Sequence, residues 1–420
     1  MSSDIAAPPP TTPEPALPAD PLPYRLGLPQ YFRGFAWGVV LPAVALTMMG
    51  LYAIGAAKPE YAKKQLFFLT VGLGVFVAVS IPQYRRLARW AYVVLAVCLV
   101  LLAITMFMPA RNGARRWIFL AGWQLQPSEL TKLAFIVAMA EYLRFRENHR
   151  TFVGLAAPFA LTLLPMGMIL IEPDLGTSLL FLPTLFAMLF AAGARRKHLI
   201  GIVVMGVLAL PLFWTVMRDY QRMRVAVLLR QLPDGVREKV RSTFRLPDDH
   251  LLFGAGGMDY RFRTGDGHHL VVSLETLREG EVFGVDDDDP AVRSGLNRLP
   301  ENHTDFIFAV WGRQTGFVGS LFLLGTFLTL VYFGLGVALG TPDPFGRLLA
   351  IGITTILAVQ ALVNVGMIVG LMPITGITLP FVSYGGTSLL SSYAALGLLV
   401  NVSRRRPFLL SRAAFEFGED

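Results

Sequence analysis

The sequence predicts an all-α membrane protein with about ten transmembrane helices and a large extracellular loop between the seventh and eighth spans. The chain has 420 residues, of which 54% are hydrophobic and only 16% charged, and its mean hydropathy is +0.54. Soluble domains average about 45–50% apolar and about 25% charged residues, so a water-soluble protein is a poor fit. The single cysteine, Cys98, excludes a disulfide framework and a cysteine-based metal site.

Apolar runs follow one another along the chain, and each predicts a helix, because a backbone in hydrocarbon must satisfy its own hydrogen bonds. The runs cover 35–57, 66–82, 88–109, 130–143, 152–171, 176–193, 198–217, 306–339, 347–371 and 380–402.

The polar segments set the domain boundaries. Residues 1–30 are proline-rich and predict a disordered cytoplasmic tail. Spans one to seven are expected within 31–217, the large extracellular loop at 218–303, spans eight to ten within 304–403, and a second cytoplasmic tail at 404–420. Short helices are expected in the loop at 234–244 and 268–277, as parts of a partly folded cap.

Basic residues orient the spans, because Lys and Arg near the ends of a span resist translocation. A cytoplasmic N-terminus, and with ten spans a cytoplasmic C-terminus, puts most basic clusters inside. Those clusters are Arg85, Arg86 and Arg89; Arg144, Arg146 and Arg150; Arg195, Arg196 and Lys197; and Arg404, Arg405 and Arg406. The exception is Arg111, Arg115 and Arg116, which lie outside. Lys58, Lys63 and Lys64 also lie outside, but Glu60 dilutes their charge.

Three polar groups interrupt the apolar pattern, at 126–132, 172–177 and 303–309, and all are expected on the outer face. Charges at membrane depth are costly and usually face a cavity or a partner. They could also be interfacial charges that snorkel, cap helices and pair with one another. Three such groups on one face favour a functional site.

The chemistry of these groups suits a lipid diphosphate. Arg and Lys bind phosphate oxygens through charge-assisted hydrogen bonds, and a nearby carboxylate can act as general base on a hydroxyl. Together they would move a sugar from a lipid diphosphate to an acceptor sugar. The alternatives are a transporter or flippase that uses the same polar cavity, and a scaffold without chemistry. A scaffold would not need Asp305 and Lys132 at membrane depth.

Several motifs follow in a fixed order along the chain. They are Arg-Trp-Ile at 116–118, Gln-Pro-Ser-Glu-Leu-Thr-Lys at 126–132, Glu-Pro-Asp-Leu-Gly-Thr at 172–177, Leu-Pro-Glu-Asn-His-Thr-Asp-Phe-Ile-Phe-Ala at 299–309, Asn-Val-Gly-Met at 364–367, Gly-Leu-Met-Pro-Ile-Thr-Gly at 370–376 and Leu-Pro-Phe-Val-Ser-Tyr-Gly-Gly-Thr-Ser at 379–388. Their order and spacing resemble the shape, elongation, division and sporulation (SEDS) family from about residue 35 to 403. The Met-Pro-Ile-Thr-Gly form at 372–376 is more similar to the RodA branch, which serves elongation and rod shape, than to the FtsW branch of cell division.

The resemblance implies a peptidoglycan glycosyltransferase that polymerises lipid II on the outer face of the bacterial cytoplasmic membrane. Asp305 would be the catalytic carboxylate, which deprotonates the acceptor hydroxyl or holds a divalent cation such as Mg or Mn. Arg116 and Lys132 would bind the diphosphate, Glu129 and Asp174 would orient these cations, and Ser383 would lie near the substrate.

The resemblance also implies partners. These are a class B penicillin-binding protein, which supplies transpeptidase activity, and other membrane proteins of the elongation complex. Neither an organic cofactor nor a nucleic acid is expected.

The sequence departs from the family pattern in two places. The family's glycine-rich segment before the catalytic Asp corresponds to 269–284, where Val272 replaces Gln and Arg278, Glu279 and Glu281 replace small residues. After Ala309 the family often has a Glu-Glu pair, whereas this chain has Gly-Arg-Gln at 312–314.

Overall fold

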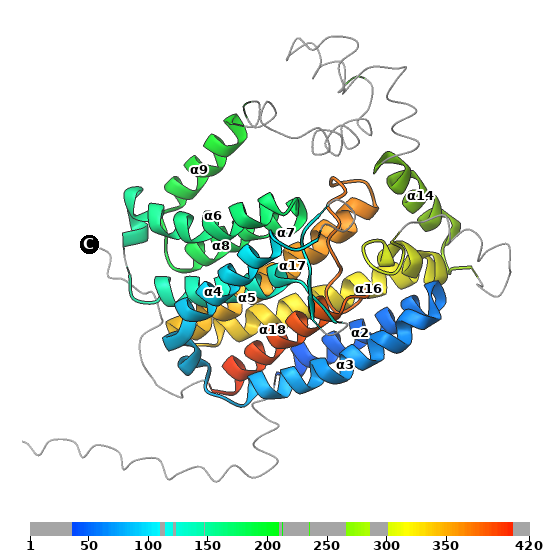
Figure 1. Ribbon diagram of the computed structural model, residues 1–420, viewed down its shortest axis with the longest axis horizontal. Coiled ribbons are helices and arrows are strands. Elements are labelled where there is room, and N and C mark those ends of the chain that lie inside the picture. The colour runs from blue at the N-terminus through cyan, green and yellow to red at the C-terminus, as the bar shows by residue number, and fades with distance from the viewer. Residues whose placement is uncertain are drawn as a thin grey trace, which may run out of the picture. The chain divides into compact units, whose positions relative to one another are not determined.

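The computed structural model describes residues 36–109, 114–120, 123–146, 148–209, 266–285 and 301–405, with the isolated positions 212 and 235. The described part is predominantly helical (Figure 1), as the apolar runs predict. The expected helix at 234–244 lies almost wholly outside the described residues, as do both tails.

The first three helices are α2 (Trp37–Ala57), α3 (Pro59–Ser80) and α4 (Tyr84–Thr105). Single-residue and three-residue connections join them. Pro59 occupies the first position of α3, where its missing N–H group costs no helical hydrogen bond. Pro82 lies in the bend between α3 and α4, where a helix cannot easily continue.

A small hairpin precedes the fourth long helix. Strands β1 (Ile118–Leu120) and β2 (Trp123–Leu125) pair antiparallel, with Phe119 opposite Gln124. The hairpin leads into α5 (Pro127–Leu143), which is buried along most of its length. Two 3₁₀ turns, η1 (Asn148–Arg150) and η2 (Val153–Leu155), then lead into α6 (Ala156–Ile171).

The expected sixth span is two helices, α7 (Leu175–Leu179) and α8 (Phe181–Ala191), which meet at Leu180. Pro183 explains the division, because it cannot donate to the carbonyl of Leu179 and fits the first turn of a new helix. After a tight turn, α9 (Arg196–Leu208) follows.

The later helices are α14 (Asp266–Glu279), α16 (Ile307–Leu339), α17 (Pro344–Ile368) and α18 (Gly386–Arg404). The helix expected at 268–277 is confirmed within α14. Helix α16 is kinked at Gly316, whose φ of 68° and ψ of −164° are not helical. The segment after α14 hydrogen-bonds across this kink, from Phe317 N to Glu281 O (3.0 Å) and from Val318 N to Val282 O (3.1 Å).

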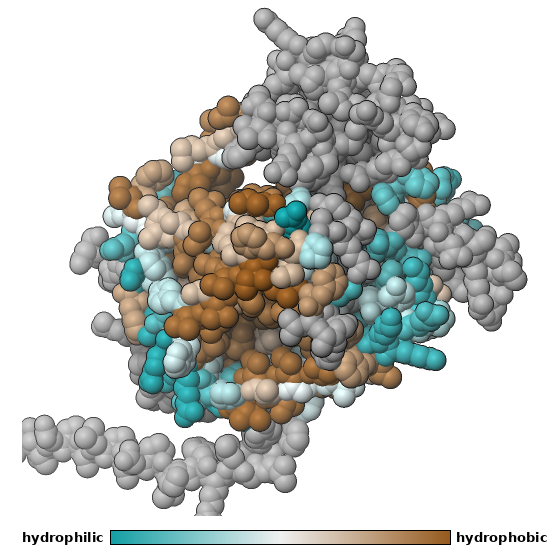
Figure 2. All heavy atoms as spheres, in the orientation of Figure 1, coloured by the Kyte–Doolittle hydropathy of each residue, from teal (hydrophilic) through white to brown (hydrophobic). Residues whose placement is uncertain are grey.

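Six described helices are long and apolar enough to cross a membrane. They are Trp37–Ala57, Pro59–Ser80, Tyr84–Thr105, Val153–Ile171, Ile307–Leu339 and Pro344–Ile368. The count of ten spans and the position of the large loop remain predictions. Figure 2 shows a face that is apolar in its middle and hydrophilic towards its two sides, and exposed valines along α4 (Val93, Val97 and Val100) are typical of a lipid-facing surface.

Helices far apart in sequence pack together. Helix α18 packs on α3, α16 on α2, and α4 on α5 (Figure 1). At one end of this assembly, Arg85 lies 3.7 Å from Asp343 at the start of α17, and the Arg405 guanidinium donates to the carbonyl of Ile81. Arg85 and Arg405, which belong to two basic clusters expected in the cytoplasm, therefore lie at the same end of the described helices.

Candidate functional site

A cavity of about 1060 Å³ is lined by Arg116 and by one of the three polar groups of the sequence analysis, that at 303–309. Its walls come from the start of α3, the hairpin, the turn before α16, the loop after α17 and the start of α18. The lining residues are Lys58, Tyr61, Lys63, Lys64, Phe67, Phe68, Ala114, Arg116, Trp117, Gln124, Glu301, His303, Thr304, Asp305, Thr375, Gly376, Tyr384, Gly385 and Gly386.

Asp305 lies in the turn that precedes α16 and lines this cavity. Its main-chain oxygen accepts a hydrogen bond from Asn364 Nδ2 at 2.9 Å, and the same amide donates to the oxygen of Ile377 at 2.6 Å. Asn364 of α17 thus joins the Asp305 turn to the loop 375–378. In that loop Gly376 has a φ of +70°, and a Cβ there would lie 3.3 Å from Asp305 Oδ2. A glycine therefore permits the close approach of the loop to the carboxylate.

Arg116 lines the same cavity from the β1 side. Its guanidinium donates to the main-chain oxygens of Glu172 (3.3 Å) and Pro173, and Nη1 lies 3.9 Å from Asp174 Oδ1. Asp174 in turn caps α7, because its carboxylate accepts from Thr177 N (3.1 Å) and Thr177 Oγ1 (2.9 Å). The turn at 172–174 therefore holds Arg116 in a fixed orientation beside the cavity.

Glu172, directly after α6, is buried and bonded to the Thr105 hydroxyl. Burial raises the pKa of this carboxyl to about 7, although the hydrogen bond from Thr105 works in the opposite direction. The sequence places Glu172 in the right turn, but its near-neutral pKa follows only from the packing around it.

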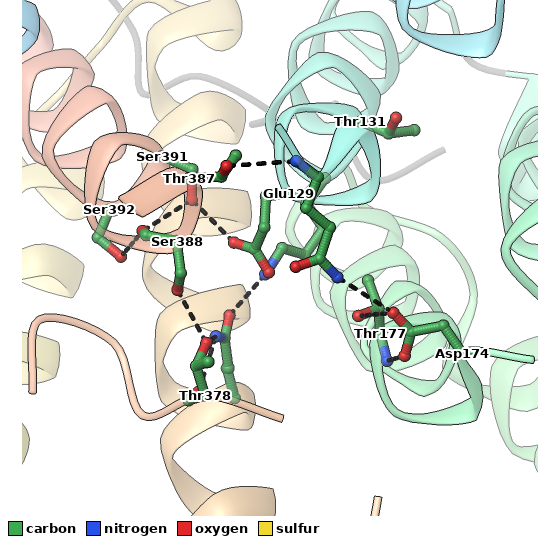
Figure 3. Close-up of polar contacts among 12 residues, drawn as sticks. Glu129, Thr131, Asp174, Thr177, Thr378, Thr387, Ser388, Ser391 and Ser392 are labelled. Carbon is green, nitrogen blue, oxygen red and sulfur yellow. Dashed lines mark hydrogen bonds and ion pairs between the residues drawn. The ribbon is translucent and has the colours of Figure 1, made fainter. Parts of the chain in front are cut away.

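Glu129 and Lys132 form a buried ion pair on α5, with Lys132 Nζ 2.8 Å from Glu129 Oε1. The same ammonium donates to Gln360 Oε1 on α17 at 2.8 Å, and neither charged residue is among those that line the cavity. Ser391 of α18 donates to the other oxygen of Glu129 at 2.9 Å (Figure 3). The pair therefore joins α5, α17 and α18 behind the cavity wall.

The network around this pair extends in two directions. Towards the loop, Gln360 Nε2 donates to Thr378 O at 2.9 Å, and the hydroxyls of Thr378 and Ser388 are 2.8 Å apart. Figure 3 shows Thr378 and Ser388 on one side of Glu129 and Asp174 with Thr177 on the other. On that second side, Gln126 joins the start of α5 to Asp174 (3.4 Å). These hydrogen bonds connect polar side chains of α5, α17 and α18, of the turn before α7 and of the loop that contains Thr378.

Ser383 is buried and its hydroxyl is committed to the backbone. It donates to Thr304 O at 2.6 Å and accepts from Leu379 N at 2.7 Å. Ser383 is not among the lining residues, whereas the following Tyr384, Gly385 and Gly386 are. This serine therefore fixes the backbone directly before Asp305.

Sequence reasoning missed one wall of the cavity, which α3 provides. Lys58, Lys63 and Lys64 line it, although Glu60 suggested a diluted surface charge. Their clustering at one end of a helix that begins at Pro59, with Lys58 as its N-cap and Lys63 and Lys64 in its second turn, was the available signal. The Tyr61 ring, also on α3, lies 4.4 Å from the ring of His303, whose pKa is lowered by burial and by the charge of Lys58.

The match to a known family identifies the family to which this chain belongs. Residues 30–407 match the model of the cell cycle protein family that comprises FtsW, RodA and SpoVE. The chain belongs to this family. The RodA and FtsW branches named above are both members of it, so the SEDS resemblance is confirmed.

Relatives from more than one branch of the SEDS family are similar to this chain. The probable peptidoglycan glycosyltransferase FtsW of Geobacter metallireducens is 36% identical over 386 residues, which cover 87% of this chain and 94% of the relative. The peptidoglycan glycosyltransferase MrdB of Escherichia coli is 31% identical over 374 residues, which cover 88% and 93%. A solved structure titled as the structural coordination of polymerization and crosslinking by a peptidoglycan synthase complex contains a similar chain. It has a TM-score of 0.71 and 31% identity, and the match covers 89% of this SEDS chain and 98% of that one.

Proposed function

We propose that this SEDS protein is a peptidoglycan glycosyltransferase that polymerises lipid II into glycan strands. The observation that carries the proposal is that the Asp305 carboxylate and the Arg116 guanidinium line one cavity. A base and a cation that share a cavity suit a reaction in which a hydroxyl attacks and a diphosphate leaves.

In this reaction Asp305 is the catalytic residue. Its carboxylate accepts the proton of the acceptor sugar 4-hydroxyl, and the hydroxyl oxygen forms a bond to the anomeric carbon of the donor. The bond between that carbon and the diphosphate oxygen breaks, and the lipid diphosphate leaves with the electron pair. Arg116 stabilises the negative charge on the leaving oxygens.

The other site residues that the sequence analysis named position Asp305 and Arg116. Asp174 orients Arg116, consistent with their separation of 3.9 Å. Lys132 with Glu129, and Ser383, hold the helices and loops that carry the catalytic groups. The two amide side chains of α17 support this positioning role, because Gln360 contacts Lys132 (2.8 Å) and Asn364 contacts Asp305 (2.9 Å).

A divalent cation fits the cavity only together with substrate. Among the described residues no cluster of three or more His, Cys, Asp or Glu side chains could hold a metal ion. The cavity offers two carboxylates, Glu301 and Asp305. Mg²⁺ is commonly bound by one or two carboxylates plus substrate phosphates, so these two would hold Mg or Mn and neutralise diphosphate charge.

The cellular setting follows from the family and the charge pattern. The proposed protein spans the bacterial cytoplasmic membrane ten times, with the boundaries expected from the sequence. Both termini lie in the cytoplasm, and the active site lies on the outer face of the membrane. A class B penicillin-binding protein is the proposed partner, supported by the similarity to a chain of a peptidoglycan synthase complex. Other elongation-complex membrane proteins would join it.

Two observations favour different branches of the family. The Met-Pro-Ile-Thr-Gly motif at 372–376 favours elongation, and the 36% identity to an FtsW favours division. Depletion of the protein in its own cell separates them, because loss of rod shape supports elongation and filaments without septa support division.

Purified protein in liposomes with labelled lipid II tests the activity itself. Glycan polymer that appears with the wild-type chain and disappears with Asp305→Asn is the expected result. Transbilayer movement of lipid II without any polymer would replace the glycosyltransferase by a flippase.

A further inference from the structure

Three lysines at the start of α3, one of them its N-cap, give the cavity more positive charge than Arg116 alone. Lys58, Lys63 and Lys64 line it, and within the described residues none of them forms an ion pair. The lining contains four Lys and Arg side chains against the two carboxylates Glu301 and Asp305. An excess of cations in a partly enclosed space attracts an anionic ligand.

Aromatic contacts place this lysine group next to the Asp305 turn. The Nζ atoms of Lys58 and Lys64 lie 5.6 Å and 5.3 Å from the centre of the Tyr61 ring. That ring lies 4.4 Å from His303, two residues before Asp305, and 4.7 Å from Tyr384. The start of α3 adds the positive end of a helix dipole to the same wall.

The two cationic groups are built differently. Arg116 is fixed by the carbonyls of Glu172 and Pro173 and by Asp174. The lysines have flexible stems and strongly hydrated ammonium groups, and Lys63 and Lys64 are exposed. A fixed fork suits a phosphate that must be held in one orientation while its bond breaks. Mobile point charges suit a phosphate that must be held loosely and then moved.

We propose that Lys58, Lys63 and Lys64 form a second diphosphate subsite, which holds the diphosphate that remains on the acceptor while Arg116 stabilises the one that leaves. This inference rests on the proposed glycosyltransferase function. Both substrates of that reaction are lipid diphosphates, so each transfer brings two of these anions into one cavity. The proton passes to Asp305 and one diphosphate departs, but the acceptor's diphosphate is unchanged and has to shift before the next transfer.

The direct test measures binding apart from turnover. Fluorescent lipid II is titrated into full-length protein in phosphatidylcholine nanodiscs, with Asp305→Asn present in every variant to prevent polymerisation. Replacing all three lysines by Gln should weaken lipid II binding at least about tenfold. Replacing them by Arg should restore most of the affinity. A Lys197→Gln variant, which removes a cation at the start of α9, should bind like the parent.

The second arm measures polymerisation with Asp305 intact. The triple Gln variant should raise the KM for lipid II about tenfold and change kcat less than about threefold. Unchanged binding and unchanged KM would overturn the subsite. An effect that appears only when phosphatidylglycerol is present would also overturn it, because the lysines would then bind bulk headgroups.

The outcomes keep this proposal separate from the function. If the wild-type chain makes no polymer, the proposed function fails, and the assignment to an acceptor fails with it. Polymerisation by the wild type with normal lipid II binding by the triple Gln variant would remove only the lysine subsite.

Discussion

Asn364 donates a side-chain hydrogen bond to the main-chain oxygen of Asp305 at 2.9 Å, and this contact joins the Asp305 turn to the last part of α17. Asn364→Leu should therefore lower kcat at least about tenfold with little change in KM, because two buried carbonyls lose their donor and the turn shifts. Polymerisation of labelled lipid II provides the measurement.

Asn401 offers a matched control for that change. Its buried amide donates to Val79 O (2.8 Å) and Pro82 O (2.5 Å), at the end of the bundle where Arg405 lies. Asn401→Leu should lower the thermal unfolding midpoint about as much as Asn364→Leu does, because each change removes the donor of two carbonyls. It should leave kcat per folded molecule unchanged. Equal losses of kcat in both variants would contradict a specific role for Asn364.

Gly376 should tolerate no side chain. Its φ of +70° costs an L-residue about 1–2 kcal/mol, and a Cβ would crowd Asp305 Oδ2 at 3.3 Å. Gly376→Ala should reduce both stability and polymer formation. Gly193→Ala, at a φ of +88° between α8 and α9, should reduce stability alone. Normal activity of Gly376→Ala would show that the loop leaves the carboxylate undisturbed.

The Glu129–Lys132 pair should be more sensitive to loss of one partner than of both. Lys132→Met leaves a buried carboxylate without its cation, which costs about 3–5 kcal/mol. The double variant Glu129→Gln, Lys132→Met should recover a large part of that stability. Thermal unfolding in detergent of the two single variants and the double variant measures the coupling; additive losses would argue against a direct interaction.

Glu172 predicts a pH dependence of stability. Its pKa is about 7 in the folded protein against 4.5 for an ordinary carboxyl, so the folded state binds the proton more tightly. The stability from this group is full below about pH 4.5, falls as the pH rises towards 7 and is lost above that. Unfolding midpoints between pH 4.5 and 8 should decline less steeply in Glu172→Gln than in the wild type. Parallel curves would assign the dependence to other groups.

Sequence patterns predicted the predominantly helical structure, because apolar runs are local signals. They could not predict which motif residues reach the cavity. Lys132 and Arg116 look alike in sequence, but the neighbouring Gln360 and Ser391, contributed by distant helices, enclose the ion pair of Lys132 in the core. Lys58, Lys63 and Lys64 were underrated because Glu60 stands among them in the sequence, whereas within the described residues no ion pair joins Glu60 to any of them.

Two departures from the family pattern turn out to be one feature. Glu279 stands where a small residue is expected and Arg313 where the family has an acidic pair, and in the structure Arg313 Nε lies 3.0 Å from Glu279 Oε2. Each substitution looks unfavourable when read separately. Together they form an ion pair between α14 and α16, which no single position in the sequence could reveal.

The cavity also has a consequence for biosynthesis. Its walls begin at Lys58 and end at Gly386, at the first residue of the last described helix. No earlier stage of synthesis can enclose it, and a chain released before α18 lacks the serine that contacts Glu129. Truncated products would therefore carry the charges of Glu129 and Lys132 without the helix that completes their burial.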